Sequence, residues 1–292
     1  MTRPFTLAGV ISVLPTAFHD DGSLDLAGIR SLVDANVRAG VAGVTILGVM
    51  GEAAELAEAE RDEVLAAVVD AAGDLPVVLG ISAPSAAVIA DRSRAAVASG
   101  ARAVMVSPAR DVPLAAAVEA AASGGLPIVV QDYPAGSGVA VTAAELAAVA
   151  ANRLVAGIKA EAPPTSSVVA DLRRLRPSLA VVGGLGGLFL IDELRAGAAG
   201  TMTGFALPER LVEIVRRFAS APDEAGDAWA RLLPLMRLEA FPPFSLAARK
   251  EVWRLRGVIA SSHCRRTGAV LDETARADIR RALHAVMGPT PA

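Results

Sequence analysis

Residues 43–81 contain one complete strand–helix–strand unit, which reads GVTIL (43–47), a helical stretch over 58–72, and PVVLGI (76–81). Both outer segments are short and nearly continuously apolar, which is typical of strands that are buried on both faces. The central stretch has apolar residues at helical spacing and no interior proline. The unit therefore predicts two parallel strands joined by a covering helix.

The same alternation extends in both directions from this unit. The predicted strands are GVISVL (9–14), GVTIL (43–47), PVVLGI (76–81), AVMVS (103–107), PIVVQ (127–131), VAGIKAE (155–161), AVVGG (180–184) and GTMTG (200–204). The predicted helices cover 25–39, 58–72, 85–99, 113–123, 142–151, 165–176, 188–196 and 208–219. Eight strand–helix units in series favour a fold of the α/β class, the closed (β/α)8 TIM barrel, over an open sheet.

The strand pattern stops near residue 222. Three later stretches, 223–241, 245–259 and 272–287, are typical of helices. We therefore expect residues 1–221 to form the catalytic barrel and residues 222–292 to form a C-terminal extension of three helices. No low-complexity linker separates the two parts, so we expect one folded unit.

The composition argues against several classes of function. The 292 residues carry a formal net charge of −3 without a basic stripe, which argues against nucleic-acid binding. No apolar run reaches the ~18 residues of a membrane span, and the N-terminus lacks a signal-peptide pattern, so we expect a cytoplasmic protein without a membrane partner. Three scattered histidines and a single cysteine give no metal-site spacing, and no dinucleotide fingerprint is present. We expect no metal and no cofactor.

Lys159 is the leading catalytic candidate. Only Lys159 and Lys250 are lysines among the 28 basic residues. Lys159 lies near the C-terminal end of the sixth predicted strand, where barrel enzymes place their active sites. Burial favours the neutral amine, which is the nucleophile that attacks a carbonyl. The alternative is a lysine at the barrel rim that pairs with a carboxylate.

Two side chains are expected beside Lys159. Because strand side chains alternate, Glu161 shares a face with Lys159 and is suited to proton transfer, although a simple ion pair is an equally good interpretation. The fifth strand leads into QDYP (131–134), where Gln131 and Tyr133 share one face and Asp132 points the other way.

Two glycine-containing turns are candidates for binding a substrate carboxylate. In GVMGE (48–52), the N–H groups of Val49, Met50 and Gly51 are suited to hold such a group. The turn GGLGG (183–187), which includes Gly184, is either an anion cradle or room for a helix N-terminus. Thr203, at the end of the eighth strand, completes the set of candidate substrate-binding residues.

Together these motifs resemble the dihydrodipicolinate synthase/N-acetylneuraminate lyase family. The resemblance covers the whole chain and includes the opening GVISVLPTAFHDDGSLD (9–25), the GVMGE turn, the proline that ends the fifth strand, and the lysine motif GIK (157–159). It implies a barrel with a C-terminal helical domain, assembled as a homotetramer or a homodimer. It also implies Schiff-base chemistry on pyruvate-like 2-oxo acids without a metal or an organic cofactor.

The chain departs from the dihydrodipicolinate synthases of this family at the proton relay and at the anchor of the second substrate. Where those enzymes carry two threonines, an aromatic pair, a tyrosine and an arginine, this chain has Val49 and Met50, Ala109 and Arg110, Gln131, and Gly136. The sequence leaves the role of Arg110 open. We therefore expect a reaction other than the one in lysine biosynthesis.

A different branch is more similar. The combination of GVMGEA, VQDYP, IKAEAP and GGLGG resembles the 2-keto-3-deoxy-sugar-acid dehydratases, in particular the L-2-keto-3-deoxyarabonate dehydratases. The resemblance implies that Lys159 forms the imine, that Glu161 is the acid/base and that Gln131 lines the pocket. It also implies a structural role for Lys250. Glu55 stands where we expect a basic residue in this branch, which leaves the substrate's identity open.

We therefore expect a Schiff-base-forming lyase, most specifically a carbon–oxygen hydro-lyase that dehydrates a 2-keto-3-deoxy sugar acid. The first alternative is a pyruvate-dependent aldolase, a carbon–carbon aldehyde-lyase, because the same imine supports cleavage between C3 and C4. The second alternative is a non-catalytic paralogue that binds a 2-oxo acid. Retention of Lys159 in a lysine-poor chain argues against the second alternative.

Overall fold

The eight predicted strands are all present in the computed structural model, which describes residues 5–240, 244–266, 268 and 270–288. All are parallel, in the order β7-β6-β5-β4-β3-β2-β1-β8. An isolated parallel bridge between Gly183 and Thr201 joins the two ends of this sheet, so the strands form a nearly closed barrel. The strands are β1 (Gly9–Val13), β2 (Gly43–Ile46), β3 (Val77–Gly80), β4 (Ala103–Val106), β5 (Ile128–Asp132), β6 (Val155–Ala160), β7 (Ala180–Val182) and β8 (Gly200–Thr203).

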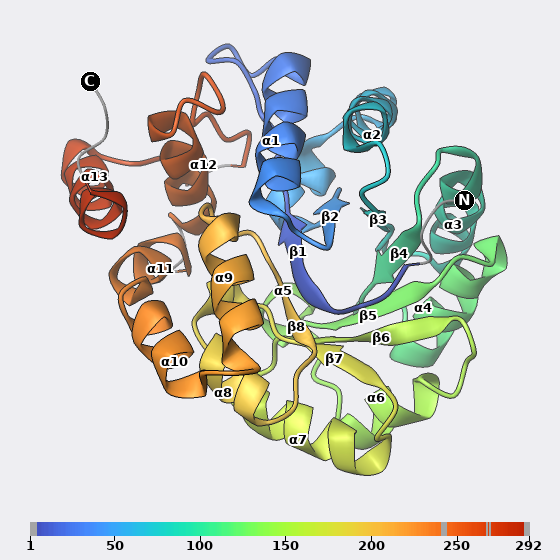
Figure 1. Ribbon diagram of the computed structural model, residues 1–292. Coiled ribbons are helices and arrows are strands. Elements are labelled where there is room, and N and C mark those ends of the chain that lie inside the picture. The colour runs from blue at the N-terminus through green and yellow to red at the C-terminus, as the bar shows by residue number, and fades with distance from the viewer. Residues whose placement is uncertain (1–4, 241–243, 267, 269, 289–292) are drawn as a thin grey trace.

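The helices surround the strands, as Figure 1 shows. Those that follow the strands are α1 (Leu26–Ala39), α2 (Glu58–Ala72), α3 (Ala86–Ala98), α4 (Leu114–Ala121), α6 (Ala143–Val149), α7 (Thr165–Leu175), α8 (Leu190–Arg195) and α9 (Pro208–Phe218). A short helix, α5 (Pro134–Ser137), follows β5 and was not expected from the sequence. The 3-10 turns are η1 (Val49–Gly51), η2 (Ala53–Glu55), η3 (Ala122–Gly124) and η4 (Leu185–Gly187). The (β/α)8 barrel predicted from the sequence is confirmed.

Two apolar layers flank the strands. Inside the barrel, side chains such as Ile11, Val129 and Met202 form a small inner core. A larger cluster lies between the outer face of the strands and the helices, and it includes Ile128 and Val130 on either side of Val129. Both faces are therefore buried, which explains why the strand sequences are almost continuously apolar. The polar side chains that line the pocket described below lie at the C-terminal ends of the strands.

The C-terminal extension contains four helices in its described residues, where the sequence predicted three. They are α10 (Pro222–Ala230), α11 (Leu233–Ala240), α12 (Ser245–Leu255) and α13 (Glu273–Met287). The stretch 223–241, expected as one helix, is divided between α10 and α11. Pro234 lies in the first turn of α11, and a proline in a helix interior removes one hydrogen bond and clashes with the carbonyl four residues earlier. The division of the chain at residue 221 stays a prediction.

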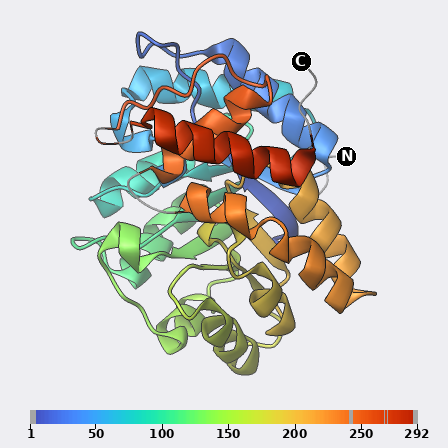
Figure 2. The same ribbon diagram turned by 90° about the vertical axis from the view of Figure 1, so that its left-hand side faces the viewer.

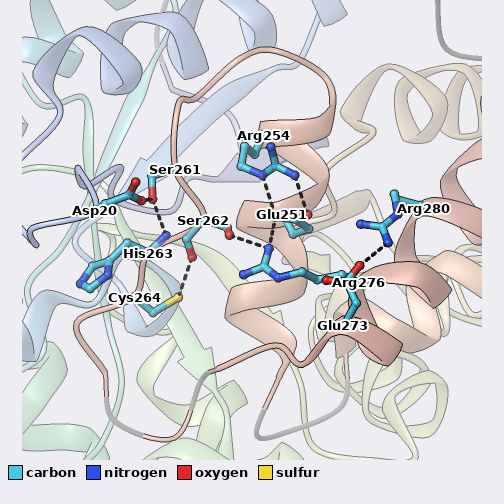
Figure 3. A network of polar contacts seen from close by, with 10 residues as sticks. All are labelled: Asp20, Glu251, Arg254, Ser261, Ser262, His263, Cys264, Glu273, Arg276 and Arg280. Atoms are coloured by element: carbon cyan, nitrogen blue, oxygen red, sulfur yellow. Dashed lines mark hydrogen bonds and ion pairs between the residues drawn. The ribbon is translucent and has the colours of Figure 1, made fainter.

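The extension packs on the barrel and is tied together by ionic contacts. Figure 2 shows α13 lying across this side of the molecule, where it contacts α11 and α12. The buried carboxylate of Glu251 on α12 accepts hydrogen bonds from Arg254 at 2.8 and 2.9 Å and from Arg276 on α13 at 2.7 Å (Figure 3). On the barrel side, the indole N–H of Trp229 donates to the carbonyl of Gly187 in η4 at 2.8 Å. The extension thus holds a loop that borders the strand ends.

The lengths and apolar character of the helices show whether any of them could cross a membrane. None of the helices within the described ranges combines the length and the apolar character needed to cross a bilayer.

Candidate active site

A pocket of about 160 Å³ lies at the C-terminal ends of the strands. Its wall includes Gln131 and Tyr133 from β5 and the residue after it, Lys159 from β6, Glu161 directly after β6, and Thr203 from β8. The structure therefore brings together the five polar side chains that the sequence predicted at these strand ends. Parallel strand ends converge at one mouth of a barrel, which is why residues far apart in the chain meet there.

Glu161 is the centre of the polar contacts in this pocket. Its Oε2 lies 2.9 Å from the Lys159 Nζ and accepts a hydrogen bond from the Gln131 Nε2 at 2.7 Å. Its Oε1 accepts the backbone N–H of Leu185 at 3.0 Å. Lys159, Glu161 and Gln131 are each less than a tenth exposed. The carboxylate is thus held in one position, directly beside the amine.

The strand register explains this arrangement. Gln131 of β5 and Lys159 of β6 are directly paired across the two strands. Positions 159 and 161 point to the same side because strand side chains alternate. The same alternation turns Asp132 away from the pocket, as the sequence predicted.

Gly184 has a spatial role beside Glu161. A Cβ atom at position 184 would lie only 2.2 Å from the Glu161 Oε1, so a larger residue would exclude the carboxylate from its position. At Gly183, a Cβ would lie 1.6 Å from an oxygen of the buried Glu193 of α8. The two glycines thus make room for two glutamate side chains, and the sequence analysis did not predict this role for either glycine. A substrate contact of Gly184 stays a prediction.

The turn after β2 offers two of the three expected amide donors. Val49 and Met50 line the pocket, and their backbone N–H groups donate to no acceptor within the described residues. The N–H of Gly51 donates instead to the Gly48 carbonyl at 3.0 Å, and Gly51 faces Leu14 and Thr16 rather than the pocket. An anion at this turn would therefore be held by the first two amides.

The glutamate of the same turn is part of a separate, fully enclosed ion pair. Glu52 and Lys250 are both 0% exposed, and their Oε2 and Nζ atoms lie 2.5 Å apart. The Lys250 ammonium also donates to the carbonyl of His263 at 2.7 Å and lies 4.4 Å from the centre of the Phe18 ring. These contacts fix the turn against α12, which supports a structural role for Lys250. Arg110 is exposed and lies outside the pocket wall.

Buried acidic groups surround the site. Asp132 is 1% exposed, its carboxyl oxygens have no hydrogen-bond partner among the described residues, and burial together with the charge of Glu161 raises its pKa to about 6. Burial raises the pKa of Glu193 to about 7, with a further contribution from the charge of Glu161. Burial also raises the pKa of the Tyr133 phenol, with a further contribution from Glu161, so this group is protonated at neutral pH. Glu161 is therefore the carboxylate best placed to exchange protons in the pocket.

Arg249 was missed by the sequence analysis. It comes from α12, yet its side chain forms part of the wall of the same pocket as Lys159. The only local signal is an arginine next to Lys250 in a helix that also carries Glu251 and Arg254, and that pattern does not say which cavity the side chain reaches. No group of three or more histidine, cysteine, aspartate or glutamate side chains suited to a metal ion is found in the described part of the chain.

Comparisons with known proteins agree with this geometry. Residues 6–286 match the model of the Dihydrodipicolinate synthetase family. The chain is 35% identical over 288 residues to L-2-keto-3-deoxyarabonate dehydratase of Azospirillum brasilense, which covers 93% of this chain and 92% of that protein. It is 34% identical over 239 residues to 4-hydroxy-tetrahydrodipicolinate synthase of Stenotrophomonas maltophilia, which covers 78% and 80% of the two chains. The crystal structure of dihydrodipicolinate synthase from Rhodopseudomonas palustris superposes with a TM-score of 0.91 at 32% identity, over 97% of this chain and 99% of that one.

Proposed function

Because the chain belongs to the Dihydrodipicolinate synthetase family, whose members are lyases, we propose that it dehydrates a 2-keto-3-deoxy sugar acid through a Schiff base on Lys159. The observation that carries the proposal is the contact of one carboxylate, Glu161, with both Lys159 and Gln131 at the wall of a pocket. The named activity of the Azospirillum brasilense relative supports dehydration over other reactions of the family.

The first steps form the imine. The substrate carboxylate binds the N–H groups of Val49 and Met50, which brings C2 toward Lys159. Glu161, 2.9 Å from the ammonium, accepts its proton and releases the neutral amine. The amine attacks the C2 ketone, and the resulting carbinolamine loses water with a proton returned by Glu161. The product of these steps is a cationic imine, with Glu161 again ionised.

The next steps eliminate the C4 hydroxyl. The cationic imine acidifies the C3 proton, because the electrons of that C–H bond flow toward nitrogen. Glu161 is the only carboxylate among the described wall residues, and it removes this proton to give an enamine. The enamine expels the C4 hydroxyl, which leaves as water with the proton that Glu161 has just taken. Water then hydrolyses the imine and frees Lys159.

Aldol cleavage is the second candidate, and the position of Tyr133 favours it. This phenol lines the pocket and is protonated at neutral pH, so it is a possible partner for a C4 hydroxyl. If a base removes the proton of that hydroxyl, the bond between C3 and C4 breaks, C4 leaves as an aldehyde and the enamine of pyruvate remains. Protonation of this enamine at C3 gives the imine of pyruvate, which water hydrolyses. The two reactions have different products and can be separated directly.

Borohydride trapping followed by product analysis tests the proposal. The protein is mixed with pyruvate, and separately with a 2-keto-3-deoxypentonate, reduced, and digested. Because the chain has only two lysines, Lys250 serves as an internal control, and we expect the adduct on Lys159 alone. Loss of water from the sugar acid without pyruvate release supports dehydration, and pyruvate release supports the aldolase. The absence of any adduct would refute both and favour a non-catalytic 2-oxo-acid-binding protein.

The oligomeric state of the protein is predicted separately from its reaction. We expect a homotetramer, or a homodimer, and the molar mass measured by light scattering tests this.

A further inference from the structure

The guanidinium of Arg249 is a buried cation in the pocket wall. The residue is 6% exposed, and it donates no hydrogen bond to any described residue. Two glycines leave it space: a Cβ at Gly204 would lie 3.1 Å from one terminal nitrogen, and a Cβ at Gly186 would lie 3.4 Å from the other. The side chain thus enters the pocket between the loops that follow β7 and β8.

Glu239 forms only a long ion pair with this cation and accepts no hydrogen bond from it. The Oε2 of Glu239 lies 3.8 Å from the Arg249 Nε, which is too far for a hydrogen bond, and this oxygen already accepts the N–H of Ala206 at 3.1 Å. Burial raises the pKa of Glu239 to about 8, against the opposing effect of Arg249, so most of this group is protonated at neutral pH. A buried guanidinium whose hydrogen bonds are unsatisfied is costly. Arg249 has a long ion pair with Glu239 but no hydrogen-bond partner among the described residues, so its N–H groups are available to a ligand.

The other charges of the pocket are already matched. Lys159 pairs with Glu161 at 2.9 Å. In the proposed reaction, the substrate's own carboxylate lies beside C2 at the turn after β2. Arg249 extends from α12 into the pocket between the loops after β7 and β8, so it meets a different part of a bound substrate. The planar guanidinium is suited to hold a carboxylate through two parallel hydrogen bonds.

We propose that Arg249 binds a second carboxylate at the end of the substrate remote from the ketone, so that the preferred substrate is a dicarboxylic 2-keto-3-deoxy sugar acid. This assignment rests on the proposed function, because it presupposes that the ketone lies at Lys159. It makes Arg249 a residue that determines specificity, with no part in proton transfer.

A matched pair of six-carbon substrates tests the assignment. One is a 2-keto-3-deoxyhexonate, and the other carries a carboxylate at C6 in place of the terminal hydroxymethyl group. We expect kcat/KM for the diacid to exceed that for the monoacid by roughly 10- to 150-fold, as for the loss of one charged hydrogen-bonded contact. Arg249→Gln should remove most of this preference, chiefly by raising KM for the diacid, and Arg249→Lys should restore part of it.

Controls distinguish the possible failures. Arg254→Gln on the same helix, whose side chain pairs with Glu251 outside the pocket, should keep the preference of the natural protein. A pyruvate adduct on Lys159 of the Arg249→Gln protein shows that the site is still assembled. An adduct on the natural protein without a preference for the diacid would overturn the assignment, as would an unchanged preference in Arg249→Gln. Absence of the adduct from the natural protein would refute the proposed function itself, and this assignment with it.

Discussion

The two lysines of the chain are both buried, but they differ in whether a small molecule in the pocket can reach the ammonium group. Each ammonium is less than a tenth exposed, and each pairs with a glutamate, at 2.9 Å for Lys159 and 2.5 Å for Lys250. Lys159 lines a pocket at the strand ends. Lys250 is completely enclosed and has a backbone carbonyl and an aromatic ring as further partners.

The comparison teaches that a buried lysine–glutamate pair does not identify a reactive amine. Structural ion pairs share this feature with catalytic ones. A second property is needed, namely a cavity that brings a carbonyl carbon to the nitrogen. The predictions below separate the two lysines by their effects on chemistry and on stability.

The largest expected effect is the loss of turnover when Lys159 is replaced. Lys159→Arg keeps a cation beside Glu161 but lacks a nucleophilic amine, so we expect kcat to fall roughly 10⁴-fold or more. Steady-state kinetics on the sugar acid measures the fall, and the borohydride adduct should disappear. An adduct that persists on Lys250 would contradict the distinction drawn between the two lysines.

Replacement of Glu161, the ion-pair partner of Lys159, should slow proton transfer and leave the Lys159 amine in place. In Glu161→Gln, we expect kcat to fall by roughly 10²- to 10⁴-fold, because the pocket loses the carboxylate that we propose as its acid/base. The pyruvate adduct should form more slowly but still map to Lys159. Turnover close to that of the natural protein would show that another group carries the protons.

Replacement of Lys250 should affect stability far more than chemistry. Lys250→Met leaves the enclosed Glu52 without its cation, so we expect the free energy of unfolding to fall by roughly 3–5 kcal/mol. Urea unfolding measures the change. The double variant Lys250→Met/Glu52→Gln, in which no charge is left unpaired, should recover part of the loss. A stable single variant would show that the pair contributes little to the fold.

The smallest expected effect concerns Asp132, which lies behind the Lys159 site. Its pKa of about 6 in the folded protein is above its ordinary value of 3.8, so folding is disfavoured progressively as the pH rises between these values and the carboxyl ionises. Asp132→Asn cannot ionise. We expect it to be more stable than the natural protein at pH 7 by roughly 1–3 kcal/mol, and to lose this advantage near pH 4. Melting temperatures at the two pH values measure the difference, and parallel pH profiles would contradict it.

The barrel and the contacts around Lys159 could be predicted because they depend on local patterns. Alternation along β6 places Lys159 and Glu161 on one face, and the order of the strand ends brings Gln131 to them. The division of 223–241 at Pro234 was also visible in the sequence and was overlooked. The role of Arg249 could not be predicted, because a helix pattern does not specify which cavity an arginine from a distant extension enters. The space at Gly184 likewise depends on packing between strands that the sequence does not reveal.

The close approach of Gly184 to Glu161 makes these two positions interdependent in any redesign. With the carboxylate where it stands, even the methyl group of alanine at 184 would overlap it. A redesign that moves the proposed acid/base to another strand should therefore replace Glu161 with a smaller residue before it introduces a side chain at position 184. If position 184 were changed first, the new side chain would clash with the Glu161 carboxylate. In this chain, the side chain allowed at position 184 is therefore set by the side chain present at position 161.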